Sequence, residues 1–232
     1  MQHPSSGDNH PAHLAMPVPG SLQLEDASFA YAQSPPLLSS ITLSLEPGER
    51  VHLRGDNGSG KSTLLNLLVG LRPWQQGRML VNGRPISHTS DYPWLRQQVG
   101  FLSQEPRDHL FCPSVGDDCR FGPHNYGISH EETEQRCCWW LARVGLAGHH
   151  ATPPSHLSAG QAQLAALAAV CCCHPSILLL DEPSSDLDQQ HRDILIETLR
   201  QGPWTLCFTS HDPALVEAIT TRTITIVDGK LT

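Results

Sequence analysis

The residues with the most specific chemistry in this chain lie in one glycine-rich segment, Gly55–Thr63, which reads GDNGSGKST. The segment matches the pattern GxxxxGK followed by Ser or Thr. It follows a predicted strand, Arg50–Arg54, and opens a predicted helix. In that setting, backbone N–H groups of the loop and the N-terminus of the helix surround phosphate oxygens. The predicted phosphate-binding residues are Gly55, Asn57, Gly58, Ser59, Gly60, Lys61, Ser62 and Thr63.

Two side chains of this loop have defined roles in such a site. Lys61 is expected to reach the β- and γ-phosphates of a nucleotide as a point charge. Ser62 is expected to offer its hydroxyl to Mg²⁺. The alternative is a glycine-rich loop with an incidental lysine, and the agreement of strand, loop and helix argues against it.

Two carboxylates follow the continuous apolar run Ile177–Leu180. A run without polar alternation is typical of a strand that is buried on both faces of a parallel sheet. Asp181 and Glu182 therefore fall at the carboxyl edge of the sheet, where ligands bind in such folds. We expect Asp181 to hold Mg²⁺, mostly through water, and Glu182 to act as a general base on the attacking water. A solvated loop residue is the alternative interpretation of Glu182.

The elements that position these groups alternate between strand and helix patterns, which predicts an α/β core with a parallel sheet. The predicted strand segments are Leu22–Tyr31, Ile41–Gly55, Arg78–Val81, Val99–Ser103, Ile177–Leu180, Thr205–Thr209 and Thr223–Val227. The predicted helices are Lys61–Leu71, Ser129–Val144, Ala159–Cys173, Asp188–Arg200 and Pro213–Ile219. Residues from about 112 to 156 differ from the rest and indicate a helical insertion between strands.

The first 21 residues are rich in Pro, Ser and His and poor in large apolar residues, which predicts a disordered tail over residues 1–21. Transient metal binding by His3, His10 and His13 is the alternative to a solvated tail. Order is expected from Leu22, in a single domain that covers residues 22–230.

Composition excludes several classes of protein. The 232 residues carry 15 basic and 23 acidic side chains, a net charge of −8, which disfavours a nucleic-acid partner. No apolar run approaches the roughly 20 residues that span a bilayer, and no secretory signal is visible. We therefore expect a cytosolic protein that can dock on a membrane protein. The eight cysteines lack CxxC pairs, so we interpret them as buried small residues, not as disulfides or zinc ligands.

Further motifs resemble those of ABC-type nucleotide-binding domains. The segment LSAGQ at Leu157–Gln161 precedes the two carboxylates, and SDLD at Ser185–Asp188 follows them. The resemblance covers about residues 22 to 230. It implies a P-loop (RecA-like) α/β fold: a mostly parallel sheet core, an antiparallel N-terminal β part and an inserted α-helical subdomain at about residues 105–160.

The resemblance also implies roles for residues outside the loop. Ser158, Gly160 and Gln161 would contact the γ-phosphate of ATP held by a second subunit, and Asp188 would lie at the dimer interface. Gln104 would link Mg²⁺ and the attacking water to a membrane partner, and His211 would contact the γ-phosphate. Tyr31 would stack on adenine, with packing within a strand as the alternative. Glu182, His211 and Gln104 are thus the predicted catalytic residues, and Ser62, Gln104 and Asp181 the predicted metal ligands.

A narrower resemblance lies at Gln104–Gly127, which is similar to energy-coupling factor ATPases that serve cobalt, nickel and B-vitamin importers. Leu110–Phe111 and Phe121–Pro123 carry most of it. The resemblance implies an ATP-hydrolysing importer subunit at the cytoplasmic face of the inner membrane. Its implied partners are integral membrane transport subunits and a second ATP-binding subunit, either another copy or a close relative.

Three residues depart from the family pattern: Ala159 replaces a glycine, His109 a glutamine and Leu164 an arginine. The missing arginine keeps open a regulatory subunit that binds ATP and barely hydrolyses it, although Lys61 and Glu182 favour an active enzyme. An ATPase of another ABC import system is a second alternative, which the FGP element disfavours. A DNA-repair or chromosome-structure ATPase is a third, and the insertion is too short and lacks heptads for it.

Overall fold

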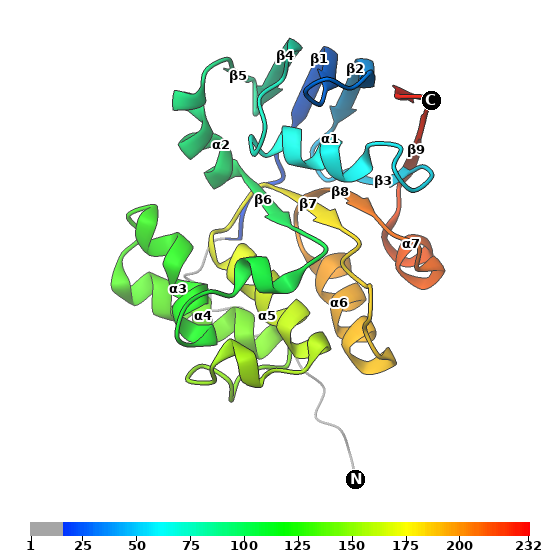
Figure 1. The fold of residues 1–232 in the computed structure, drawn as a ribbon. Helices are drawn as coiled ribbons and strands as arrows, with labels where there is room; N and C mark the ends of the chain where they lie inside the picture. The colour runs from blue at the N-terminus through cyan, green and yellow to red at the C-terminus, as the bar shows by residue number, and fades with distance from the viewer. Residues whose placement is uncertain (1–15) are drawn as a thin grey trace.

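The computed structural model describes residues 16–232, which form two sheets with helices between and around them (Figure 1). His3, His10 and His13, with most of the predicted tail, lie outside the described residues. Within the described range, no helix is both long enough and apolar enough to cross a membrane.

The end of the predicted tail belongs to the folded body. Met16 packs against the core. The backbone N–H of Gly20 donates to the carbonyl of Ser176 at 3.1 Å, and its carbonyl accepts from the Thr205 hydroxyl at 2.5 Å. The folded chain therefore starts before Leu22, the residue at which the sequence predicted that order begins.

The N-terminal part is a four-stranded antiparallel sheet, at the top of Figure 1, with the order β2-β1-β4-β5. Its strands are β1 (Leu22–Ala30), β2 (Pro36–Leu45), β4 (Gln76–Val81) and β5 (Arg84–Ile86). Side chains along β1 and β2 alternate between buried and more exposed at most positions, so one face of this sheet packs on the rest of the molecule.

The core is a six-stranded sheet with the order β10-β9-β3-β8-β7-β6, in which all neighbouring pairs are parallel except β9 and β10. Its strands are β3 (Arg50–Arg54), β6 (Val99–Leu102), β7 (Ile177–Asp181), β8 (Thr205–Thr209), β9 (Arg222–Val227) and β10 (Lys230–Leu231). Every residue of β7 and β8 is buried, as the apolar run in β7 predicted. The predicted mostly parallel core and antiparallel N-terminal part are both confirmed.

Helix α1 (Lys61–Leu68) lies between the two sheets (Figure 1). Its buried leucines share one apolar cluster with side chains of β1, β2 and β7. The helix ends before the predicted Leu71 because Gly70 adopts a left-handed backbone with φ of +70°. The opposite face of the core sheet is covered by α5 (Ala159–Cys172) and α6 (Gln189–Gln201) in a second apolar cluster.

The other helices are shorter and lie around the sheets. They are α2 (Tyr92–Gln98), α7 (Pro213–Ile219) and the 3₁₀ turns Thr89–Asp91, Pro106–His109 and Pro154–His156.

The helical subdomain contains α3 (Val115–Asn125) and α4 (His130–Arg143) as well as α5. The sequence predicted α4 closely. It did not predict α3, because Gly122 and Pro123 are typical of turns. The helix forms nevertheless, since Ser114 caps its N-terminus and Val115 is buried in the apolar cluster shared with α4 and α5.

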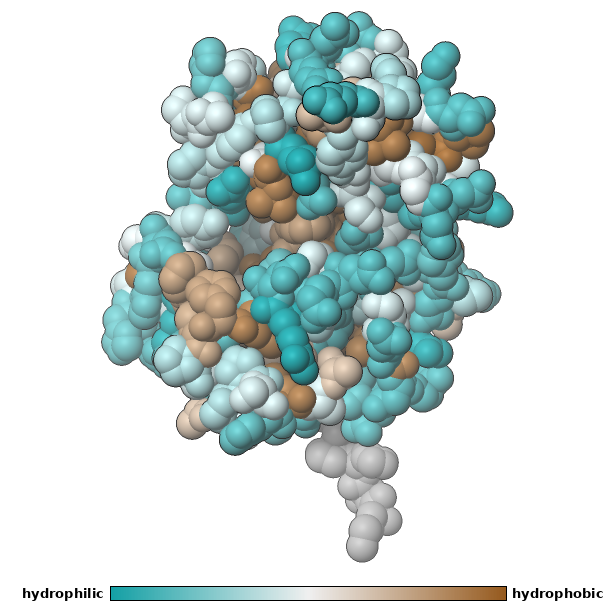
Figure 2. Space-filling model, viewed as in Figure 1, coloured by the Kyte–Doolittle hydropathy of each residue, from teal (hydrophilic) through white to brown (hydrophobic). Residues whose placement is uncertain are grey.

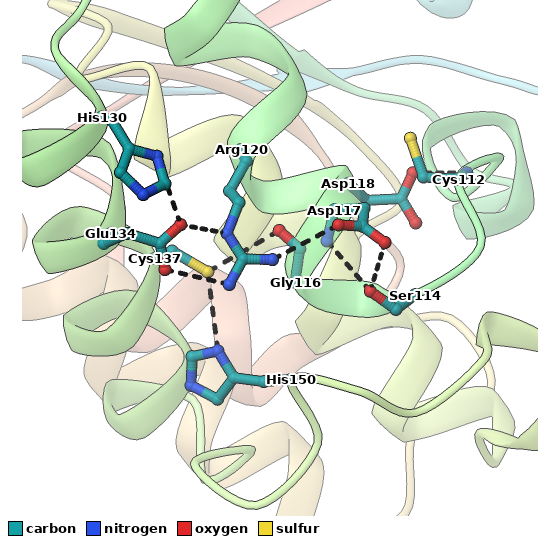
Figure 3. Close-up of polar contacts among 10 residues, drawn as sticks. All are labelled: Cys112, Ser114, Gly116, Asp117, Asp118, Arg120, His130, Glu134, Cys137 and His150. Atoms are coloured by element: carbon teal, nitrogen blue, oxygen red, sulfur yellow. Dashed lines mark hydrogen bonds and ion pairs between the residues drawn. The ribbon is translucent and has the colours of Figure 1, made fainter.

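Polar contacts fix α3 against its neighbours (Figure 3). The guanidinium of Arg120 forms a two-point ion pair with the Glu134 carboxylate of α4, in which Nη2 and Oε2 are 2.9 Å apart. Asp118 Oδ1 accepts the backbone N–H groups of Phe111 and Cys112 at 3.0 and 2.9 Å. The segment before α3 is therefore tied to the helix and holds Phe111 in place.

The eight cysteines are free thiols, and five of them are buried. Burial raises the pKa of the Cys207 thiol to about 12, so it stays protonated and unreactive at neutral pH. Cys138 is exposed on α4, which differs from the prediction of buried small residues.

Candidate functional site

The glycine-rich segment forms the turn between β3 and α1 that the sequence predicted. Gly58 and Gly60 have φ angles of +80° and +104°, in the region that favours glycine. A Cβ at Gly60 would also lie 3.0 Å from Leu38 of the N-terminal sheet. The loop therefore depends on glycine for its conformation and for its packing under β2.

Polar groups of this loop fit a phosphate ligand. The Lys61 Nζ donates to the carbonyls of Gly55 and Asp56 at 2.8 and 3.0 Å, so the ammonium group is folded over the loop. The Ser59 hydroxyl is buried and has no hydrogen-bond partner among the described residues. Phosphate oxygens would accept from both groups, because each is a hydrogen-bond donor next to the N-terminus of α1.

One groove brings the loop together with the predicted catalytic residues. It is lined by Gly55, Asn57, Gly58, Ser59, Lys61, Glu182 and His211. Gln104 lines an adjoining groove that also contains Glu182 and His211. Residues more than 150 positions apart in the chain thus meet at the carboxyl edge of the core sheet.

The two carboxylates are positioned by a threonine on the next strand. Asp181, the last residue of β7, pairs in register with Thr209 of β8. The Thr209 hydroxyl donates to Asp181 Oδ1 at 2.8 Å and accepts the backbone N–H of Glu182 at 2.9 Å. Glu182 itself has a φ of +48°, which is uncommon for a residue with a side chain. The buried hydroxyl therefore orients both acidic residues.

Glu182 and His211 contact each other directly in the folded chain. The carboxylate accepts the backbone N–H of His211 at 3.1 Å, and the His211 ring Nε2 lies 3.6 Å from the other carboxylate oxygen. The Glu182 side chain is only 16% exposed, against 71% for His211. This burial disfavours the interpretation of Glu182 as a solvated loop residue.

Tyr31 is anchored beside the phosphate loop. Its hydroxyl lies 3.0 Å from that of Thr63, in the first turn of α1. Its ring packs edge-on against Phe29, and the Arg72 guanidinium lies 5.1 Å from the ring centre. The residue is 39% exposed, so both packing within the strand and contact with a base are compatible with its position. Stacking on adenine stays a prediction.

The signature segment lies outside this groove. Ser158 caps α5: its hydroxyl accepts the Gln161 backbone N–H at 3.2 Å, and the Gln161 amide oxygen accepts the Ser158 N–H at 3.0 Å. A Cβ at Gly160 would lie 2.8 Å from the His191 ring, whose Nδ1 is 2.8 Å from Asp188 Oδ1. None of Ser158, Gly160 or Gln161 lines the two grooves described above.

The three residues that depart from the family pattern differ in their burial and contacts. Leu164 is fully buried in the apolar cluster around α5, so it acts as a core residue. Ala159 is exposed. His109 is half-buried, and its Nε2 accepts the backbone N–H of Ser103 at 3.0 Å, beside Gln104. The sequence did not predict the roles of Thr209 and His109. Thr209 contacts residues of a neighbouring strand, and His109 contacts Ser103 across a turn of the chain.

A phosphate loop and an acidic pair at the carboxyl edge of a parallel sheet define the class of P-loop ATPases. Residues 38–185 match the family described as ABC transporter. The chain is 36% identical over 215 residues to the energy-coupling factor transporter ATP-binding protein EcfA of Methanothermobacter thermautotrophicus, with 90% of this chain and 69% of that protein covered.

Solved structures of ATP-binding subunits have the same fold as this chain. The structure of cbiO1 from Clostridium perfringens, part of the ABC transporter complex cbiONQ, has 28% identity and a TM-score of 0.80, and the match covers 91% of this chain and 86% of that one. A dimeric ATP-binding cassette, MJ0796, bound to ADP and Pi, has a TM-score of 0.77 over 90% of this chain and 96% of its own. Its 23% identity shows the fold alone.

The chain belongs to the ABC transporter family. The ATPases of this family use ATP with Mg²⁺, so the predictions of an ABC-type ATPase and of these two ligands are confirmed. The roles of the individual site residues stay predictions.

Replacing Thr209 by Val should lower stability and slow hydrolysis. The substitution keeps the shape but leaves the Glu182 N–H and Asp181 without their partner, and an unsatisfied buried group costs about 1–3 kcal/mol. Urea unfolding and phosphate release would measure both effects. Thr209→Ser, which retains the hydroxyl, is the control. Equal stability of the Val variant and the wild type would contradict the assigned role of the hydroxyl.

Acidification should loosen the segment around Gln104. Only a neutral His109 ring can accept the Ser103 N–H, and burial lowers the pKa of His109 below its ordinary value. The unfolded chain therefore binds more protons than the folded one. The free energy of unfolding should be fully retained above the ordinary histidine pKa and decrease as pH falls through the lowered pKa.

His109→Gln should flatten this pH dependence, because an amide oxygen can accept the same N–H without titrating. Some dependence should remain, since burial also lowers the pKa of His52. Urea unfolding at a series of pH values would test this, with the exposed His156 changed to Gln as the control. Identical pH profiles for His109→Gln and the wild type would rule out His109 as a source of the effect.

Proposed function

We propose that this chain is the ATP-hydrolysing subunit of an energy-coupling-factor-type importer at the cytoplasmic face of the cell membrane. The cargo class that we propose is a transition metal ion, cobalt or nickel, or a vitamin, which enters through a membrane partner. The observation that carries the proposal is an exposed aromatic pair, Phe111 and Phe121, in the segment that resembles energy-coupling factor ATPases.

The pair has the character of a docking surface. Phe111 and Phe121 are 63% and 48% exposed, and their ring centres are 4.9 Å apart in an edge-to-face arrangement. Apolar atoms gather over the helical subdomain in Figure 2. Asp118 holds the Phe111 backbone, so the pair is exposed in a fixed position. Exposed aromatic groups of this kind mark contact sites for other proteins.

The pair lies close along the chain to Gln104, which lines the groove of Glu182 and His211. A membrane subunit on the aromatic pair would therefore contact the same segment as the nucleotide site. ATP-driven closure of two subunits is a ligand-driven population shift, and it would move the helical subdomain together with the bound membrane subunit.

The chain's own residues define the chemistry in this proposal. Lys61, the loop N–H groups and His211 stabilise the charge of the transferring phosphoryl group, and Glu182 orients the attacking water. Oxygen donors of Ser62, Asp181 and Gln104 suit Mg²⁺, which neutralises phosphate charge when bound. Ser158, Gly160 and Gln161 lie outside the groove of Lys61 and complete the site of a second subunit, and Asp188 lies at that interface.

A weakly hydrolysing regulatory subunit is the second candidate, and Leu164 is the observation that favours it. The side chain is buried in the core, so the position offers no charge to the dimer interface. The buried carboxylate of Glu182 and its contact with His211 favour the active enzyme instead.

Glu182→Gln should abolish most hydrolysis and leave ATP binding intact. A general base contributes about 10²–10⁴-fold to the rate, and the amide keeps the shape of the side chain. Phosphate release and nucleotide affinity would be measured, and size-exclusion chromatography with ATP should show a trapped dimer. The exposed Glu217 of α7, changed to Gln, is the control. Rapid phosphate release by Glu182→Gln would remove this residue from the mechanism.

Tagged protein purified from its native membrane should bring along integral membrane subunits, and the substrate-binding subunit would name the cargo. The double variant Phe111→Ser/Phe121→Ser should lose these partners, because the apolar contact is removed. Leu71→Ser, at another exposed apolar residue, should retain them. Partners of another ABC import system, or none at all, would contradict the energy-coupling proposal, and equal capture by the double variant would contradict the docking surface.

A further inference from the structure

A buried histidine lies in the wall of the groove that contains the phosphate loop. No motif in the sequence marks this residue as functional. His52 is on β3, three residues before Gly55, and it is only 8% exposed. It lines the same groove as Lys61, Glu182 and His211. A buried polar ring at this place needs a partner, since an unpaired one costs stability.

The partner is on β8. The parallel register pairs His52 with Phe208, and the two rings stack with centres 5.4 Å apart. The His52 Nε2 lies 3.2 Å from the carbonyl oxygen of Ser210, just past the end of β8. A carbonyl can only accept, so Nε2 must carry the proton. Burial lowers the pKa of His52, which favours the neutral ring at physiological pH.

The accepting carbonyl belongs to the peptide bond between Ser210 and His211. The N–H at the other side of this peptide donates to Glu182 Oε2 at 3.1 Å. One planar peptide group is therefore held at both ends, by His52 on its oxygen and by Glu182 on its nitrogen. The Ser210 hydroxyl adds a contact to Ser184 at 3.2 Å.

We propose that His52 is a positioning residue for ATP hydrolysis. By fixing the plane of the Ser210–His211 peptide, it keeps the His211 N–H aimed at Glu182. That bond holds one carboxylate oxygen and leaves the other directed toward the His211 ring. The inference rests on the proposed role of Glu182 as the base and adds a residue on a different strand that determines its orientation.

The position of His52 predicts which kinetic constant it controls. Its ring bonds to the peptide before His211 and has no hydrogen bond to the Gly55–Thr63 backbone that would hold the nucleotide. Loss of the bond should therefore lower kcat and leave KM and nucleotide affinity nearly unchanged, because the effect appears only when water is activated.

The test is a pair of substitutions in the full chain. His52→Leu keeps an apolar side chain against Phe208 and removes the donor. It should lower kcat about tenfold, the scale of one lost hydrogen bond. His52→Gln should restore most of kcat, because its amide nitrogen can donate from nearly the position of Nε2. Steady-state phosphate release with MgATP gives kcat and KM, and thermal unfolding checks that each variant is folded.

His52→Asn provides the same comparison if the Leu variant does not fold, because it is polar but too short to reach the carbonyl. A kcat for His52→Leu or His52→Asn within twofold of the wild type would overturn the inference. So would a Gln variant no more active than these two, or a change confined to KM.

Glu182→Gln, measured in parallel, separates this inference from the function on which it rests. An inactive Glu182→Gln with a fully active His52→Leu would refute only the role of His52. Unimpaired hydrolysis by Glu182→Gln would refute the assignment of the base, and the role of His52 with it.

Discussion

The parallel register of β3, β8 and β7 brings the charged groups of the nucleotide site together. In this register, β7 pairs with β8 so that Asp181 lies opposite Thr209, and β8 pairs with β3 so that Phe208 lies opposite His52. The phosphate loop and Glu182 directly follow β3 and β7, and His211 lies two residues after the end of β8. A shift of one residue between any two strands would turn the supporting side chains to the other face of the sheet.

The register is in turn secured by burial on both faces. All residues of β7 and β8 are buried. Helix α1 covers one face, and α5 and α6 cover the other. Helix α5 suits this place because its middle carries no charge and most of its residues are buried, including Leu164. An arginine there would need a partner or a route to solvent, whereas the leucine adds to the core.

The sequence was sufficient to predict those parts of the site whose structure depends on residues close together in the chain. The apolar run in β7, the glycines of the loop and the helix pattern of Ala159–Cys173 are local signals, and each element is in the predicted place. Helix α3 was missed, because burial of Val115 and the Arg120–Glu134 ion pair outweigh the turn preference of Gly122 and Pro123.

The supporting residues of the site could not be recognised from the sequence for a different reason. Thr209 and His52 are not themselves part of a motif. Their roles arise from strand pairing, which places a hydroxyl under two carboxylates and an imidazole beside a peptide carbonyl. A sequence read along the chain contains no signal for such cross-strand contacts, although the strand order and register determine them once the sheet is known.

The position of the signature segment, outside the groove of Lys61, links this geometry to the proposed assembly. Within one chain, Ser158 and Gln161 bond to each other, and Gly160 is packed against His191, which in turn bonds to Asp188. The signature and the Asp188 turn therefore form one connected unit, separate from the groove of Lys61. In the proposed function, the N-terminus of α5 in this unit would contact a phosphate held by a second subunit. Movement of that unit on ATP binding would carry α5, and α3 packed beside it, toward or away from a partner on Phe111 and Phe121.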